Sequence, residues 1–295
     1  MPDLPINRLR TRTRLAVGAL LGLIALASWP ASGPANPAPF ASRWIVGNHT
    51  RARLVAAPVL SNDARLRVYA GVHMILDDGW KTYWRTPGEA GGIPPSFDWS
   101  KSVNLASATV LYPVPRRLPG PYGETVGYKH EVLFPVHLTP RDPAKPIELR
   151  LVIYYGVCLD ICIPAEGEAR LLVEPSSRTS NPAAPLLSRF LGRVPGYGSN
   201  RPKIERMVAK LDGGDPHLLI DARFDGPGTR ADLFLEAPDG IFIPAPRRTE
   251  LARKGHFRFR VDLTRTEDPA LFKGRKLRLT LASDGGQSEA DWLVD

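Results

Sequence analysis

Cysteine is scarce in this sequence, and long apolar runs are almost missing. The 295 residues contain two cysteines, Cys158 and Cys162, with no histidine close to them in sequence. A closed zinc site needs four ligands, so this pair alone does not make one. The uncharged apolar run over residues 15–27 has 13 residues, whereas a bilayer span needs about 20. No other stretch comes near that length, so we expect no transmembrane span in the mature chain.

The N-terminus has the layout of a secretory signal peptide. Four arginines stand before the apolar run, and small residues follow it in "SWPASGPANPA". A positive region, a short apolar core and small residues are typical of a cleaved signal. Cleavage after Ala27 and cleavage just before Pro34 both fit, so we assign residues 1–33 to signal and leader. An uncleaved membrane anchor is the alternative.

After the N-terminal arginines, charge of one sign does not gather in any stretch of the chain. The net charge is +9, and it falls to +6 when residues 1–27, with four arginines and Asp3, are removed. The remaining basic residues alternate with acidic ones, as in "PRRTELARKGHFRFRVDLTRTED". Such mixing is typical of a solvated surface and argues against nucleic-acid binding. A weak attraction to an anionic membrane surface stays open.

Turn-forming residues are abundant. The chain has 30 prolines and 26 glycines, and 43% of its residues are hydrophobic. This composition predicts many short strands joined by turns, in two domains of ordinary size. The stretch "RLRVYAGVHMIL" alternates apolar and polar residues, which predicts a half-buried strand with His73 on the wet face. His130 is likewise expected at the surface.

The composition changes in the middle of the chain. We predict a first strand-rich domain over residues 40–176 and a linker over residues 177–202 with a short helix near residues 183–193. Six strand-like segments follow in residues 203–295, which suggests a second β-sandwich. This second block has no cysteine and no recognisable site.

The spacing of the cysteines predicts a hairpin. In residues 147–155 the odd positions are apolar, so Cys158 should leave its strand on the wetter face. Along one straight strand, Cys158 and Cys162 would lie too far apart to bond. A turn with loop residues 159–161 would bring them face to face, and Asp160 is the residue there best suited to a left-handed conformation.

Three chemical roles are open to this pair. A loop this short gives a weak structural staple, because stabilisation by a disulfide grows with loop length. An exposed, tight disulfide is easily reduced, which favours a redox role. A purely structural disulfide and a metal site remain the alternatives.

The segments around the pair resemble a known family. Residues 40–175 resemble the N-terminal periplasmic domain of DsbD, a thiol:disulfide interchange protein, and the related suppressor-of-copper-sensitivity protein B. The resemblance is carried by "GWKTYWRTPGEAGGIPPSFDW" (79–99), "LYPVPRRLPGPYGETVGYKHEVLFPV" (111–136) and the cysteines before "IPAEGEARL". It implies an immunoglobulin-like fold. The expected fold class is therefore all-β, with two immunoglobulin-like sandwiches joined by a short linker with a helix.

The resemblance also implies a relay function. The family's pair takes electrons from a membrane carrier of the DsbD or CcdA type and passes them to periplasmic thioredoxin-like proteins. No cofactor beyond the redox-active disulfide and no metal is implied, and the location is periplasmic. An adaptor with a structural disulfide, or a copper-handling protein that uses the thiols, would be the alternative functions.

Site residues follow from the same resemblance. Cys162 would attack partners and Cys158 would resolve the mixed disulfide. A cap loop shields the family's disulfide, and its counterparts here are Pro121, Tyr122 and Gly123, with Tyr122 as the expected shield.

Further residues are expected to support the pair. Tyr83 and Trp84 correspond to aromatic residues under the family's pair, and Asp160 and Glu166 are nearby acids. This chain departs from the family in three ways: it has three residues between the cysteines instead of five, Pro121 in place of the cap phenylalanine, and no membrane or thioredoxin-like domain.

Overall fold

Strands dominate the described part of the chain. The computed structural model describes residues 40–60, 66–121, 123–174, 181–198, 202–225, 230–253 and 255–295. Within these ranges the chain is nearly all β, with one α-helix, as the all-β prediction requires. The predicted signal and leader, residues 1–33, lie outside the described residues. None of the described helices is long and apolar enough to cross a membrane.

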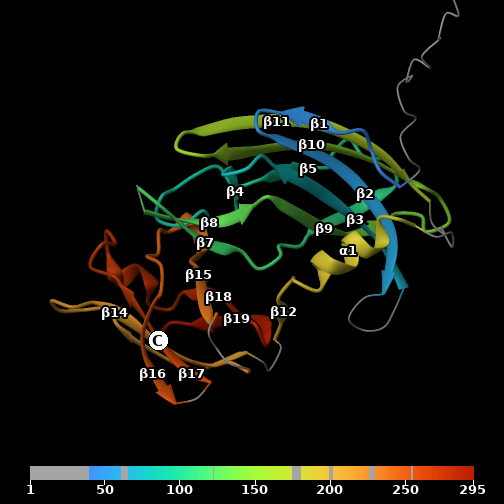
Figure 1. The fold of residues 1–295 in the computed structure, drawn as a ribbon. Helices are drawn as coiled ribbons and strands as arrows, with labels where there is room; N and C mark the ends of the chain where they lie inside the picture. Colours follow the sequence, from blue (N-terminus) through green and yellow to red (C-terminus); the bar gives the residue numbers. More distant parts are fainter. Residues whose placement is uncertain are drawn as a thin grey trace, which may run out of the picture. The chain divides into compact units, whose positions relative to one another are not determined.

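The N-terminal block, residues 40–174 together with helix α1 (Ala184–Leu191), contains two sheets (Figure 1). Side chains from both sheets, such as Phe134 and Tyr155, fill one hydrophobic core, so the sheets pack face to face. The strands of the first sheet, in spatial order, are β1 (Ile45–Gly47), β2 (Thr50–Leu60), β3 (Leu66–Leu76), β9 (Glu131–Pro140) and β6 (Leu105–Val110). Those of the second are β11 (Cys162–Val173), β10 (Ile147–Cys158), β4 (Lys81–Tyr83), β8 (Gly123–Lys129) and β7 (Arg116–Gly120), with β5 (Ser96–Asp98) also paired to β10.

Helix α1 changes the burial of one strand. It contacts β2, β3 and β9, and it buries Leu187 and Phe190 in the core of the N-terminal block. Strand β3 is therefore covered on both faces, and the prediction of His73 at the surface is wrong: this side chain is only 5% exposed. Its Nε2 lies 2.9 Å from Glu131, and burial nevertheless lowers the pKa of His73. His130 is exposed, as predicted.

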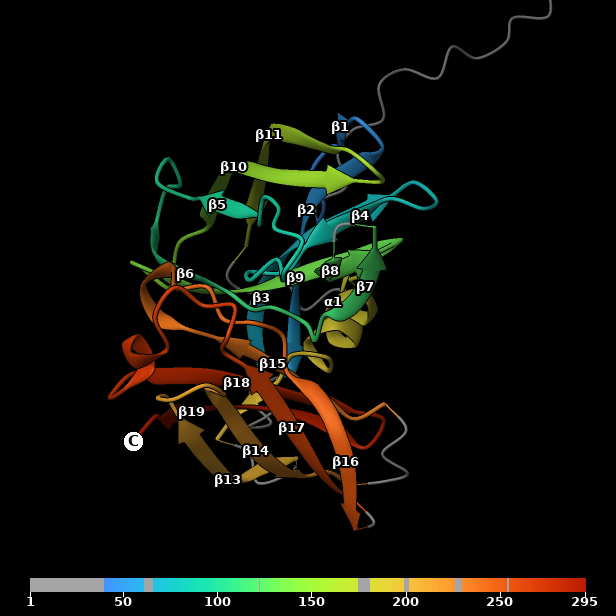
Figure 2. The same cartoon turned by 90° about the vertical axis from the view of Figure 1, so that its left-hand side faces the viewer.

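The C-terminal block, residues 196–198 together with 202–295, has two four-stranded sheets that share a second core (Figure 2). One sheet consists of β12 (Gly196–Tyr197), β19 (Gly286–Leu293), β18 (Lys276–Ser283) and β15 (Asp232–Glu236), and the other of β13 (Lys203–Lys210), β14 (His217–Arg223), β17 (His256–Asp262) and β16 (Arg247–Arg253). Two 3-10 helices, η1 (Pro238–Gly240) and η2 (Pro269–Phe272), complete the block. The six predicted strands are present. Strand β16 was missed because "RRTELAR" has no clear apolar alternation.

The two blocks pack against each other. Phe234 of β15 and Ala282 of β18 belong to the core of the N-terminal block, and the Phe234 ring lies 5.7 Å from that of Trp84. All described residues fall in one compact unit. The division into two separate sandwich domains with a linker at residues 177–202 therefore stays a prediction.

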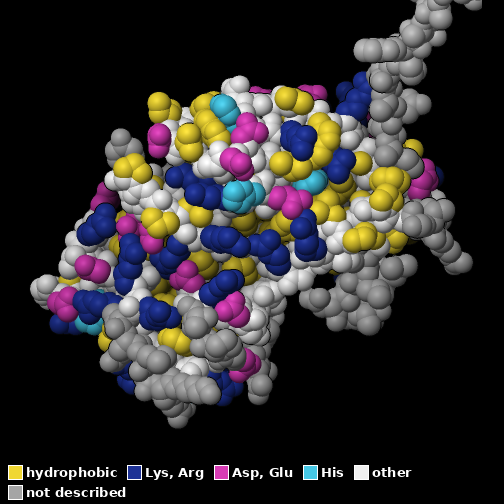
Figure 3. All heavy atoms as spheres, viewed as in Figure 1, with side chains coloured by type: hydrophobic (Ala, Val, Ile, Leu, Met, Phe, Trp, Pro, Cys, Tyr) yellow, Lys and Arg dark blue, Asp and Glu magenta, His cyan; other side chains and the backbone are white. Residues whose placement is uncertain are grey.

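On the face in Figure 3, lysine and arginine side chains gather across the middle with acidic ones among them.

Candidate functional site

The two cysteines face each other at the end of a hairpin. Strands β10 and β11 pair in a register that places Cys158 opposite Cys162 and leaves residues 159–161 as the loop. Both cysteines are free thiols, with their Sγ atoms 2.8 Å apart. The predicted hairpin is therefore confirmed. Asp160 lies in its loop without a positive φ, so the expectation of a left-handed conformation there is wrong.

The two thiols differ in exposure. Cys162 is exposed, but Cys158 is only 5% exposed, which corrects the prediction that both face water. The alternation of β10 holds as far as exposed Tyr154, and beyond it both faces are covered. The cover above Gly156 consists of Tyr83 and Ile93, since a Cβ built on this glycine would lie 3.0 Å from each of them. One thiol is thus open to a partner and the other is sheltered.

Tyr83 connects this cover to the exposed thiol. It ends strand β4, which pairs with β8 and runs beside the end of β10. Its hydroxyl lies 2.7 Å from the Sγ of Cys162, while the residue as a whole is 1% exposed. The ring lies against Gly92, where a Cβ would come within 2.1 Å of it and where φ is 147°. A glycine is needed there, both for the close approach and for the backbone conformation.

The electrostatics of the site separate the two sulfurs. Burial, followed by the hydrogen bond to Cys162, raises the pKa of Cys158, although Tyr83 and nearby Lys81 act in the opposite direction. Burial and the two thiols also raise the pKa of Tyr83, so its hydroxyl stays protonated and can donate to a thiolate on Cys162. The arrangement therefore keeps Cys158 as a thiol and offers Cys162 a hydrogen-bond donor.

The other predicted residues lie at varying positions around the pair. Trp84 is buried in the core, and its ring lies 5.7 Å from that of Phe234. Glu166 is exposed on β11 opposite Tyr154. Pro121 is exposed and Gly123 has a φ of 115°, both at the turn between β7 and β8. Tyr122, the expected shield, lies outside the described residues.

Several site residues were missed by sequence reasoning. Lys81 pairs with Cys158, Thr82 donates from Oγ1 to the carbonyl of Gly156 at 2.8 Å, and Ile93 accepts from the backbone N–H of Gly156. All three belong to segments flanking Tyr83. The motif "GWKTYWRTPGEAGGI" contains all three residues, but no local pattern indicates that this motif lies beside the end of β10.

The described residues contain no group of three or more histidine, cysteine or acidic side chains arranged to hold a metal ion.

A family model described as "Thiol:disulfide interchange protein DsbD, N-terminal" matches residues 56–174, which include both cysteines and the segments that cover them. Residues 56–174 thus match the DsbD N-terminal family. The recognised resemblance is thereby confirmed. At the family level, this DsbD-type region is a thiol:disulfide interchange module with an immunoglobulin-like fold.

A solved structure has the same fold. The crystal structure of the N-terminal periplasmic domain of ScsB from Proteus mirabilis matches with a TM-score of 0.65 and 21% sequence identity. The alignment covers 87% of this chain and 99% of the ScsB chain, so the likeness extends beyond the DsbD-type region. No curated protein sequence matches the chain significantly.

The contact between Tyr83 and Cys162 leads to a testable prediction. In a Cys158→Ala background, Tyr83→Phe should slow alkylation of Cys162 by iodoacetamide at pH 7 about tenfold. The reason is that a hydrogen bond to a charged group contributes about 1.5–3 kcal/mol, and about 1.4 kcal/mol corresponds to a factor of ten. Tyr154→Phe, which alters an exposed ring on the neighbouring strand, is the control and should leave the rate unchanged. An unchanged rate in Tyr83→Phe would refute the role of the hydroxyl.

Proposed function

We propose that the chain is a periplasmic thiol:disulfide oxidoreductase module in which Cys158 and Cys162 exchange electrons with protein partners. The observation that carries this proposal is the asymmetric pair: an exposed thiol with a tyrosine hydroxyl at 2.7 Å, and a buried thiol facing it across the hairpin. A bond that only staples the hairpin would not need this difference.

The chemistry is a two-step exchange. The thiolate of Cys162 attacks one sulfur of a partner disulfide, a mixed disulfide forms, and the partner's other sulfur leaves as a thiolate and takes up a proton. Cys158 then gives up its proton and attacks the Sγ of Cys162, which releases the partner's first sulfur as a second thiolate. The module ends with a Cys158–Cys162 disulfide, and the partner has gained two electrons and two protons as a dithiol. The sulfurs carry the electrons without a further cofactor or a metal.

The partners we propose lie on either side of this step. A membrane electron carrier of the DsbD or CcdA type would reduce the Cys158–Cys162 disulfide, and thioredoxin-like proteins of the periplasm would receive the electrons. The similarity to a periplasmic ScsB domain supports this location. Leu159 and Ile161, beside Cys162, are 44% and 77% exposed and offer apolar contacts to a partner.

We also propose that the β7–β8 turn shields the disulfide. A Cβ on Gly120 would lie 3.7 Å from the Nζ of Lys81, and one on Gly123 would lie 3.5 Å from the backbone of Ala90. The turn therefore stands beside the strand that faces Cys158. Pro121 of this turn and Tyr122, which follows it in the sequence, are the shielding residues in this proposal.

The reduction potential of the pair tests the proposed function. Equilibration with glutathione, followed by mass spectrometry of alkylated thiols, should give a value above about −300 mV, because structural disulfides typically lie below that limit. A lower value, with no exchange onto a thioredoxin-like protein, would favour the structural disulfide. Stoichiometric copper binding by the reduced form, lost in Cys158→Ala, would favour copper handling.

A further inference from the structure

The segment that carries Tyr83 also reaches the C-terminal block. Two residues after Tyr83, the guanidinium of Arg85 donates to both carboxylate oxygens of Glu236, at 2.7 and 2.6 Å. It also donates to Glu289 of β19, and Thr86 donates to Glu236 at 3.1 Å. Arg85 therefore connects the C-terminal block, through two residues of backbone, to Tyr83 at the thiol site.

This contact is mostly withdrawn from water. The side chains of Arg85, Glu236 and Glu289 are 22%, 16% and 14% exposed. Burial acts to lower the pKa of Arg85, but the two carboxylates outweigh it and raise the pKa overall. Thr280 donates to Glu289 at 3.0 Å and helps to hold that carboxylate in place. A bidentate, desolvated arginine fixes geometry as well as charge.

A second contact holds the loop that contains Glu89 and Gly92, which is called the cover loop because Gly92 lies against the Tyr83 ring. The carboxylate of Glu89 accepts a hydrogen bond from the backbone N–H of Ala245 at 3.3 Å. Arg247 and Arg265 lie 3.7 and 3.6 Å from it, and Glu89 itself is 12% exposed. Three residues further on, Gly92 lies against the Tyr83 ring. The C-terminal block thus contacts the segment that covers the thiol site at two points, Arg85 and Glu89.

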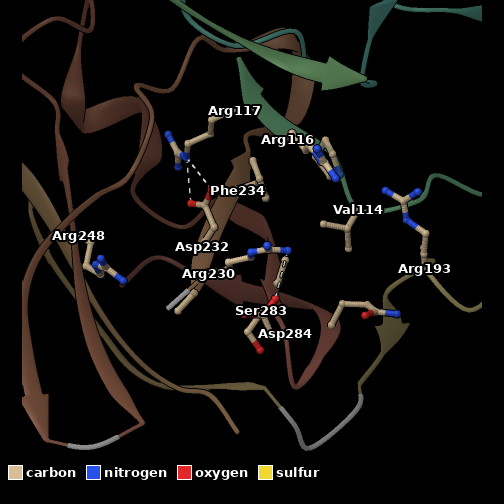
Figure 4. A pocket seen from close by; sticks show the side chains of 14 residues that line it. Val114, Arg116, Arg117, Arg193, Arg230, Asp232, Phe234, Arg248, Ser283 and Asp284 are labelled. Carbon is tan, nitrogen blue, oxygen red and sulfur yellow. Dashed lines mark hydrogen bonds and ion pairs between the residues drawn. The ribbon is translucent and has the colours of Figure 1, made fainter. Parts of the chain in front are cut away.

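A third contact holds the turn on the other side of Lys81. Arg117 of β7 binds Asp232 of β15 at 2.9 Å and donates to the carbonyls of Leu233 and Pro246. Figure 4 shows this pair on one wall of a cavity of about 680 Å³ lined by residues of both blocks. The two segments that flank the thiols are therefore each bound to the C-terminal block.

We propose that the C-terminal block acts as a positioning element for the thiol site, with Glu236 as its principal positioning residue. Through Arg85 it keeps Tyr83 at Cys162, and through Glu89 it keeps the cover loop on the Tyr83 ring. This inference rests on the proposed function, because positioning matters only if Cys162 reacts. It gives a role to the block in which the sequence shows no site.

Glu236→Gln tests the inference, because it keeps the size of the side chain and removes its charge. In the Cys158→Ala background, alkylation of Cys162 at pH 7 should slow about threefold or more, as expected for coupling through a packed network. The matched control is Asp239→Asn, three residues further on, which breaks an exposed pair with Arg275 and should leave the rate unchanged. Glu89→Gln tests the second contact in the same way if Glu236→Gln does not fold.

A double-mutant cycle separates positioning from general loosening. With Tyr83→Phe already in place, Glu236→Gln should have no further effect on the alkylation rate. An unchanged rate in Glu236→Gln alone, or an equal slowing with and without the Tyr83 hydroxyl, would overturn the proposal. Exchange of the wild-type pair with glutathione is measured separately. If wild type exchanges and the variants behave like it, only the positioning role fails, whereas absence of exchange in wild type contradicts the proposed function.

Discussion

Cys158→Ala is expected to trap the protein on its partner as a stable mixed disulfide. The exposed Cys162 still attacks, but the sulfur that would release the partner is gone. Incubation with an oxidised thioredoxin-like protein, followed by non-reducing electrophoresis, should show a covalent complex. Dithiothreitol should reduce its mixed disulfide and separate the two proteins. Turnover should fall by a factor of about a thousand or more, because loss of an essential nucleophile removes that much catalysis.

Cys162→Ala should behave differently. The remaining thiol is buried, and its pKa is raised by burial, so neither a complex nor turnover is expected. The two variants have the same number of cysteines, so they control for each other. Equal trapping by both would contradict the assignment of Cys162 as the attacking thiol.

Arg85→Met is expected to lower the free energy of unfolding by about 3 kcal/mol. The substitution keeps an apolar chain over Trp84 but leaves Glu236 and Glu289 without their common partner. Removing one member of a buried ion pair typically costs about 3–5 kcal/mol, and some residual exposure to water places this site at the lower end. Urea unfolding followed by tryptophan fluorescence measures the difference.

Arg275→Met provides the matched control. Its pair with Asp239 has similar distances, but the side chains are 43% and 70% exposed. Exposed pairs contribute about 1 kcal/mol or less, so the unfolding midpoint should move little. A similar small shift in Arg85→Met would show that the contact between the blocks contributes little stability.

Local patterns in the sequence were sufficient to predict the hairpin that carries the two cysteines. The alternation in β10 gave its core face as far as Tyr155, and the spacing of Cys158 and Cys162 required the turn that is observed. Both inferences depend on neighbouring residues, where strand periodicity and bond geometry leave few choices. The resemblance added Tyr83, which periodicity alone would have placed in the core.

The missed features depend on distant pairings. Cys158 is buried because β4 pairs beside the end of β10 and Ile93 lies against Gly156, both more than sixty residues earlier in the chain. His73 is buried where α1, about a hundred residues later, contacts β3 and where the Trp44 ring lies 5.4 Å from the imidazole. No local pattern encodes such contacts, since alternation reports only which residues share a face and not what covers that face.

The contact of Arg117 with β15 has a consequence for self-association. Strands β7 and β15 are the last strands of their sheets, and such strands expose unpaired backbone groups that can recruit another chain. The guanidinium of Arg117 on β7 donates a hydrogen bond to the carbonyl of Leu233 on β15. A foreign strand that added to β15 at Leu233 would have to displace this charged side chain. The same residue that joins the two blocks therefore disfavours strand addition at this point of the β15 edge.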